Sequence, residues 1–192
     1  VIVTIIVLVA ISSMLSRNRM QEMAQANLES SIGNQADNIN SWLTENLESF
    51  SAIKRGIEGL NLDDEALVQY LNTYVGTNDN SPNGVYVASQ SGQVVYGDGA
   101  DLSITNPTDQ QWFKEGMSRV NMAYGSPYKN GDGEYVISAS GIINDGSDDI
   151  RVAAADVTLD QISIIVNSGV KMKNASSFLV DTDDNMILAH RD

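Results

Sequence analysis

The chain has no cysteine and only one histidine, His190, among its 192 residues. The absence of cysteine excludes disulfides, thiolate zinc sites and cysteine nucleophiles. A single histidine argues against a Ser-His-Asp triad and against a metal site built from several histidines. We therefore expect no catalytic residue, no bound metal and no cofactor. A secreted hydrolase is disfavoured because no nucleophile has a plausible base.

Basic residues are also scarce, with 11 Lys and Arg against 25 Asp and Glu, which gives a net charge of −14. Such a charge repels nucleic-acid phosphates and anionic lipid, and it favours small cationic or zwitterionic partners. We therefore expect no nucleic-acid partner. The 42% of apolar residues is ordinary for a folded protein, so the sequence predicts one domain or two small ones.

The amino end is strongly apolar: residues 1–11 are almost all Val, Ile and Leu, and the apolar stretch continues to Leu15. About 20 apolar residues span a bilayer, so we interpret residues 1–15 as a transmembrane helix truncated at its amino end. A buried strand or a signal-peptide core is the alternative, but no small-residue cleavage site follows. Arg17 and Arg19 alone do not fix the orientation in the membrane.

Residues 16–60 show helical periodicity, with apolar residues three or four positions apart over most of the stretch. A helix of about 40 residues is on the order of 60 Å long, which is more than one small domain needs. We therefore predict a stalk that packs on the domain along one part and on the partner helix of a homodimer along another. A core helix of one large domain is the alternative. The apolar positions are Met20, Met23, Leu28, Ile32, Ala36, Ile39, Leu43, Leu47, Phe50, Ile53 and Ile57.

Residues 61–158 are expected to form a module of helices and strands. Acidic residues at 63–65 indicate the start of a second helix, which we expect to reach about Tyr74. The pattern of strand, strand, helix, strand, strand that follows predicts an antiparallel sheet with helices on one side, an α+β fold. The expected elements are strands at 84–88 and 93–96, a helix at 110–120 capped by Thr108 or Asp109, and strands at 134–143 and 150–156.

The carboxyl end predicts a connecting helix over residues 159–175 and the start of a second module over residues 176–192. Oxygen-bearing side chains at 181–185 match the beginning of a calcium-binding EF-hand loop. Position six of that loop is Met186 instead of Gly, and strands flank it instead of helices, so we predict a solvated hairpin turn. His190, alone on a strand, is interpreted as structural.

One stretch combines the residue types of a small-molecule pocket. The aromatic rings of Trp112, Phe113 and Tyr128 suit an ammonium group through cation–π attraction, and Asp156 provides the opposing charge. In the alternative interpretation, Trp112 and Phe113 are the core face of a helix and Asp156 caps the helix that begins at Leu159. The residue types alone favour neither interpretation.

The order of these elements resembles the double Cache sensor domains of bacterial methyl-accepting chemotaxis receptors. The resemblance covers nearly the whole chain and rests on short motifs within the expected order of elements. These are Asn106-Pro107 followed by Trp112-Phe113, Ser126-Pro127-Tyr128, Ala154-Ala155-Asp156, and Phe178-Leu179-Val180-Asp181. It implies an α+β fold in which a long amino-terminal helix precedes PAS-like antiparallel modules, the second one truncated. Residues 61–158 would be the membrane-distal, ligand-binding module.

The resemblance also implies roles for individual residues. In members that bind amino acids, an Arg two residues before the Trp holds the ligand carboxylate, and the Asp at the strand end holds the ammonium. Trp112, Tyr128 and Asp156 match that pattern, whereas Phe113 replaces a usual Tyr and Gln110 replaces the Arg. A neutral amide lacks the bidentate, charge-assisted bonds of a guanidinium.

Gln110 therefore shifts the expected ligand toward an amine or an atypical amino acid. An α-amino carboxylate stays open if Arg119, Arg151 or backbone amides compensate for the missing guanidinium.

The function implied is that of a periplasmic sensor of a transmembrane chemoreceptor in the bacterial inner membrane. It would bind a small amine or amino acid, dimerise through the amino-terminal helix, and signal to cytoplasmic kinase and adaptor proteins through a carboxyl-terminal part. The same sensor on a histidine kinase or a diguanylate cyclase is the alternative.

Overall fold

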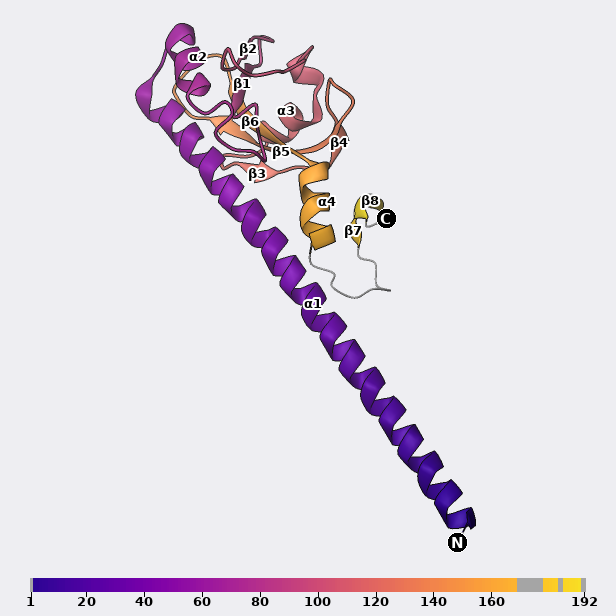
Figure 1. Ribbon diagram of the computed structural model, residues 1–192. Coiled ribbons are helices and arrows are strands. Elements are labelled where there is room, and N and C mark those ends of the chain that lie inside the picture. Colours follow the sequence, from indigo (N-terminus) through magenta and orange to yellow (C-terminus); the bar gives the residue numbers. More distant parts are fainter. Residues whose placement is uncertain (1, 169–177, 183–184, 191–192) are drawn as a thin grey trace.

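The computed structural model describes residues 2–168, 178–182 and 185–190, and a single long helix dominates it (Figure 1). This helix, α1, runs without a break from Ile2 to Leu60, 59 residues in all. The described part of the segment expected at 1–15 and the whole of that expected at 16–60 therefore belong to one helix, about 90 Å long at 1.5 Å per residue. By length and composition, α1 is apolar enough near its amino end to cross a membrane.

Among the described residues, the carboxyl-terminal half of α1 is the part of the helix that packs on the rest of the chain. Phe50, Ile53 and Ile57 are buried in the core, whereas Met20 and Met23, on the same predicted stripe, are exposed. Polar contacts fasten the packed half: the side chain of Asn46 accepts a bond from Asn78 at 2.8 Å, and Glu58 accepts the backbone N–H of Asn144 at 2.8 Å. The other half projects away from the globular part (Figure 1).

The second helix, α2 (Asp64–Asn72), begins where its acidic residues predict. Asp63 is the N-cap, and its carboxylate accepts the N–H of Ala66 at 2.9 Å. The helix ends two residues before Tyr74, and Leu67 and Leu71 bury its apolar face against α1 and the sheet.

Six strands form one antiparallel sheet in the order β2-β1-β6-β5-β3, with β4 also paired to β5. The strands predicted at 84–88 and 93–96 pair with each other as β1 and β2, those predicted at 134–143 and 150–156 pair as β5 and β6, and β6 continues two residues beyond Asp156. The two-residue strands β3 and β4 were not expected from the sequence, because so short a segment shows no alternation. The strands are β1 (Tyr86–Ser89), β2 (Val94–Val95), β3 (Ala123–Tyr124), β4 (Tyr128–Lys129), β5 (Tyr135–Ile143) and β6 (Arg151–Thr158).

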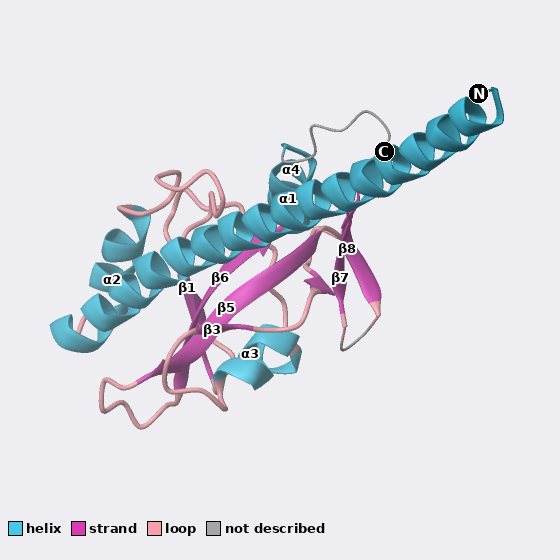
Figure 2. Cartoon of the chain, turned by 90° about the horizontal axis from the view of Figure 1, so that it is seen from below, coloured by secondary structure: helices cyan, strands magenta, loops and turns pink. Residues whose placement is uncertain are grey.

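Helices cover both faces of this sheet, so the expectation of helices on one side was wrong. The odd-numbered residues of β6, such as Ala153 and Ala155, pack in the core with α1 and α2. The even-numbered Val152 and Ala154 pack with Trp112 and a second, smaller core. Strand side chains alternate between faces, and Figure 2 shows α1 across one face and α3 on the other.

The helix expected at 110–120 is short: α3 spans Gln111–Gly116. Pro107–Asp109 form a separate 3₁₀ turn, η1, so Thr108 and Asp109 do not cap α3, and that prediction was wrong. Gln110 has an extended backbone that divides the two elements and is itself the N-cap, although its side chain forms no capping bond.

At the carboxyl end, α4 (Leu159–Ser168) follows β6, and β7 (Phe178–Asp181) pairs with β8 (Met186–His190) as an antiparallel hairpin. The rest of the helix predicted over 159–175 lies outside the described residues, as do positions 183 and 184 of the proposed hairpin turn. Gln35 on α1 donates to the carbonyl of Val166 at 3.3 Å, which ties α4 to the long helix.

Adding a methyl group is expected to have opposite effects at two glycines. A Cβ at Gly116 would lie 2.4 Å from Cγ1 of the buried Val152, whereas a Cβ at Gly59 in α1 would meet nothing within 4 Å. Overpacking a core costs about 1–3 kcal/mol, and Ala is a better helix former than Gly by about 1 kcal/mol. We expect Gly116→Ala to lower the midpoint of thermal unfolding, and the control Gly59→Ala to leave it unchanged or raise it, in differential scanning calorimetry.

Candidate ligand-binding site

The alternation of β5 and β6 places a carboxylate on the face that α3 covers. Asp156 follows Val152 and Ala154 on that face, and Ser138 of β5 lies directly opposite it in the register. Tyr86 of β1 pairs with Ala154, one step along the same face. The sheet therefore gathers three polar side chains beneath Trp112 of α3.

Three hydroxyl groups converge on one oxygen of Asp156. Tyr86 donates to Oδ1 at 2.8 Å, Tyr128 donates at 3.4 Å, and Ser138 donates through a short bond. The hydroxyls of Tyr128 and Ser138 are 2.7 Å apart. None of these bonds reaches Oδ2, so the second oxygen is left for another donor.

Asp156 carries a charge that its surroundings do not balance. Burial raises the pKa of its carboxyl group above the ordinary value, and the hydrogen bonds from Ser138, Tyr86 and Tyr128 only partly oppose this rise. Among the described residues, the ion pairs involve Glu58, Glu115 and Asp145, and none involves Asp156. A buried carboxylate without a cationic partner is costly, so the site favours a positively charged ligand.

A small hollow opens on the carboxylate. Its volume is about 20 Å³, which is room for little more than one water molecule. Its lining comes from the sheet, from α3 and from two loops that approach each other over Asp156. A Cβ at Gly131 would lie 2.1 Å from the carbonyl oxygen of Ser103, so these loops are in contact. The lining residues are Tyr86, Leu102, Ser103, Ile104, Gln110, Trp112, Tyr128, Asn130, Gly131, Asp132 and Asp156.

Four of the five predicted site residues line this hollow: Gln110, Trp112, Tyr128 and Asp156. Trp112 is 2% exposed. Its ring contacts that of Tyr86 edge to face, with 5.0 Å between centroids. The amide of Gln110 donates to the carbonyl of Thr105 at 3.0 Å. The role of all four in binding stays a prediction.

Phe113 is buried beside Trp112, with 5.7 Å between ring centroids, and is not among the lining residues. The alternative interpretation of a core position therefore describes Phe113 well. It does not describe Asp156, because the side chain of Asp156 bonds across the sheet to three hydroxyls instead of capping α4.

Arg119 and Arg151 were considered as replacements for the missing arginine that would bind a ligand carboxylate. Both have other partners. Arg119 donates to the carbonyl of Ala123 at 3.0 Å and pairs with Glu115 at 3.6 Å. Arg151 pairs closely with Asp145. The residues that line the hollow include no Lys or Arg, so the structure provides no cationic group for a ligand carboxylate there.

Tyr86 and Ser138 were not predicted from the sequence. Burial, followed by the nearby charge of Asp156, raises the pKa of Tyr86 well above its usual range, so this hydroxyl stays protonated and donates. The register of the β5–β6 hairpin pairs Ser138 with Asp156 and Ile143 with Arg151. Extending the pairing from the turn at residues 144–150 along both strands would have revealed Ser138.

Comparison with known proteins identifies the fold. No family model and no curated protein matches the chain. Among solved structures, the ligand-binding domain of the Pseudomonas fluorescens chemoreceptor CtaA, in complex with L-serine, has a TM-score of 0.68 and 20% identity over 82% of this chain and 68% of that chain. The amino acid chemoreceptor PctC of Pseudomonas aeruginosa PAO1, in complex with GABA, has a TM-score of 0.67 and 21% identity over 82% and 72%.

The Campylobacter jejuni chemoreceptor Tlp3, in complex with 4-methylisoleucine, has a TM-score of 0.63 and 20% identity over 84% of this chain and 70% of that chain. The chain spans 63% of the CtaA domain in its L-isoleucine complex. The fold is therefore that of the ligand-binding domains of bacterial chemoreceptors, and the predicted α+β class with a long amino-terminal helix is confirmed.

Proposed function

We propose that this chain is the sensing part of a transmembrane chemoreceptor and that residues 61–158 form a membrane-distal module that binds a small amine. The observation that carries the proposal is the Asp156 carboxylate. It is part-buried, accepts bonds from three hydroxyls at Oδ1, and lies at an aromatic hollow whose lining has no basic residue. An ammonium group supplies both the charge and the donors that Oδ2 lacks.

The composition of the hollow favours an amine over an amino acid. CtaA, PctC and Tlp3 were solved with L-serine, GABA and 4-methylisoleucine, each of which has a carboxylate as well as an ammonium group. Here the charged residues of the lining are Asp132 and Asp156, and both repel a ligand carboxylate. Trp112, Tyr86 and Tyr128 present rings that suit an ammonium group, while Leu102 and Ile104 suit an apolar body.

Binding requires the hollow to enlarge. A volume of about 20 Å³ holds little more than one water molecule, so the structure corresponds to a closed form. The loop at 102–104 and the turn at 130–132 are the parts that separate, because they meet through a close contact at Gly131. Closure over a bound amine excludes water and shifts the population toward one arrangement of the module.

The long helix gives this module its place relative to a membrane. The apolar amino end of α1 crosses the inner membrane, and the exposed half of its stripe, including Met20, Met23, Leu28 and Ile32, packs on a second copy of the chain. The sensor then lies in the periplasm. Ligand-dependent changes pass along α1 toward a cytoplasmic kinase and its adaptor.

Calorimetric titration of the purified chain in detergent tests the ligand class. Butylamine and norvaline share the same carbon chain and ammonium group, and norvaline adds a carboxylate. Pentanoate has a carboxylate and no ammonium group. We expect butylamine to bind, norvaline to bind at least about tenfold more weakly, and pentanoate not to bind. Tighter binding of norvaline contradicts the amine preference, and the absence of heat with a panel of primary amines contradicts the site.

A further inference from the structure

The edge of the sheet beside the site is also in contact with α1. Residues 123–129, which include β3 and β4, lie along the outer side of β5. At one end of this edge segment, Tyr128 donates to Asp156 in the site. At the other end, the hydroxyl of Tyr124 donates to the backbone carbonyl of Leu43 in α1 at 3.1 Å. One short stretch of chain therefore contacts both the carboxylate and the long helix.

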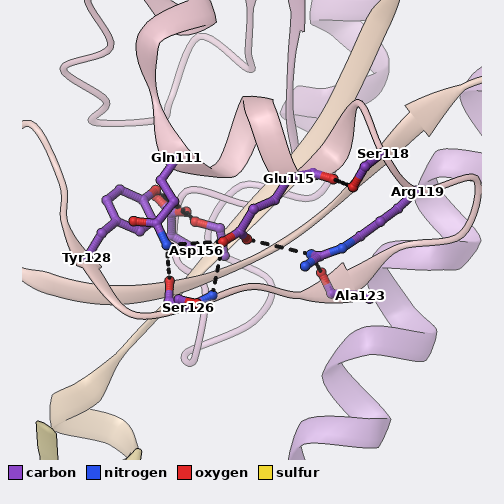
Figure 3. Close-up of polar contacts among 9 residues, drawn as sticks. Gln111, Glu115, Ser118, Arg119, Ala123, Ser126, Tyr128 and Asp156 are labelled. Carbon is purple, nitrogen blue, oxygen red and sulfur yellow. Dashed lines mark hydrogen bonds and ion pairs between the residues drawn. The ribbon is translucent and has the colours of Figure 1, made fainter. Parts of the chain in front are cut away.

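Side chains of α3 fasten the middle of the edge segment. Gln111 donates to the carbonyl of Ser126 at 3.3 Å, and Glu115 accepts the N–H of Ser126 at 3.3 Å. Gln111 also donates to Glu115 at 3.0 Å. A Cβ at Gly125 would lie 1.6 Å from Oε2 of Glu115, so the carboxylate lies directly on the backbone there. Figure 3 shows Gln111 and Glu115 converging on Ser126, with Tyr128 and Asp156 alongside.

These contacts link two walls of the hollow to each other. Trp112 is on α3 and Tyr128 is on the edge segment, and both line the hollow. A ligand that enters between the loop at 102–104 and the turn at 130–132 contacts both of these walls. Because Gln111 and Glu115 hold α3 to Ser126, displacement of either wall is transmitted to the edge segment.

We propose that Tyr124 is the residue that couples the ligand site to α1. The inference rests on the proposed function in that amine binding supplies the displacement. Gly125 donates to the carbonyl of Ser138 at 3.0 Å, so the backbone next to Tyr124 is bonded to a residue whose hydroxyl binds Asp156. A shift at Asp156 reaches Tyr124 through this bond as well as through Tyr128. The hydroxyl of Tyr124 then acts on the backbone of α1 at Leu43.

A second tyrosine provides a matched control. The hydroxyl of Tyr70 in α2 also donates to an α1 carbonyl, that of Ile53, at 3.4 Å. Its helix contributes no residue to the lining of the hollow. Tyr124→Phe and Tyr70→Phe therefore remove the same kind of bond to the same helix, and Tyr70→Phe also removes the acceptor of the Tyr74 hydroxyl. Of the two bonds to α1, the contacts described above connect the one from Tyr124 to the site.

A double-mutant cycle tests the coupling without any ligand. Asp156→Asn alters the site, and its effect on the thermal midpoint is compared in the wild-type, Tyr124→Phe and Tyr70→Phe backgrounds. Distant, independent sites give additive changes. We expect the changes to be non-additive with Tyr124→Phe and additive with Tyr70→Phe. Additivity in both backgrounds overturns the inference.

Hydrogen exchange of α1 then measures directly whether ligand binding at the site changes the long helix. On saturation with the primary amine that binds most tightly in calorimetry, we expect the exchange of peptides around Leu43 to change in the wild type and in Tyr70→Phe. Tyr124→Phe should bind the amine within about twofold of the wild type and lose that change. If Tyr124→Phe keeps the change, the inference fails. If no amine binds but the cycle is non-additive, the proposed ligand class fails and the coupling stands.

Discussion

Replacement of Asp156 with Asn is expected to raise the stability of the free protein and to weaken amine binding by about 10- to 150-fold. The amide retains an oxygen that accepts bonds from Tyr86 and Ser138, so the hydroxyl cluster keeps its acceptor. The charge that burial disfavours is removed. At the same time, the ligand loses a charge-assisted hydrogen bond worth about 1.5–3 kcal/mol, which corresponds to about 10- to 150-fold in affinity.

The stability gain should depend on pH. Because burial raises the pKa of Asp156 in the folded state above its value in the unfolded chain, the folded state holds the proton to higher pH. The wild type therefore loses stability as the pH rises from the ordinary carboxyl pKa of about 4 through the raised folded value. Asp156→Asn lacks this loss, so the two proteins should differ most at neutral pH and least in acid.

Calorimetry at several pH values, with and without butylamine, measures both effects. For a chain of this size, about 1 kcal/mol shifts the midpoint by roughly 2–4 °C. Asp160 is exposed at the start of α4 and is not among the residues that line the hollow. Asp160→Asn therefore removes the same charge at an exposed position outside the site. It should leave binding unchanged and lower stability by at most about 1 kcal/mol, because Asp160 lies in the first turn of α4. A less stable Asp156→Asn protein that still binds butylamine would refute the assigned role.

The sequence was most informative where a pattern repeats over many residues. The periodicity of residues 16–60 predicted a long helix, and the apolar stretches at 134–143 and 150–156 predicted two strands. It was least informative where one tertiary contact decides the structure. The extended backbone of Gln110 separates η1 from α3 and makes α3 six residues long, and no local pattern marks that position.

The site shows the same division. Trp112, Tyr128 and Asp156 were identified through residue types and a resemblance, and the structure places all three at one hollow. Tyr86 enters the site only because β1 pairs with β6, a contact between strands more than 60 positions apart in the sequence. Trp112 lines the hollow and Phe113 does not. This difference depends on the direction in which each ring points from the six-residue helix α3, and composition does not determine that direction.

Replacement of Gln110 with Arg is expected to reverse the ligand preference. Gln110 lines the hollow, and its side-chain amide donates to the carbonyl of Thr105 in its own loop, so a longer side chain from this position reaches the space that a ligand occupies. A guanidinium there offers bidentate bonds to a carboxylate and repels a second cation. We expect the affinity for norvaline to rise by about 10- to 150-fold, which corresponds to about 1.5–3 kcal/mol, and the affinity for butylamine to fall.

Titration of both ligands into Gln110→Arg and Gln110→Met measures the switch. Met has a similar length and no charge, so Gln110→Met should keep the preference for butylamine and separates the effect of charge from the loss of the bond to Thr105. A Gln110→Arg protein that is folded and still prefers butylamine would show that the carboxylate is excluded elsewhere. A protein that binds neither ligand would show that the introduced guanidinium pairs with Asp156 instead. The predicted gain for norvaline requires Asp156 to remain available for the ammonium group, so the double variant Gln110→Arg with Asp156→Asn should lose it.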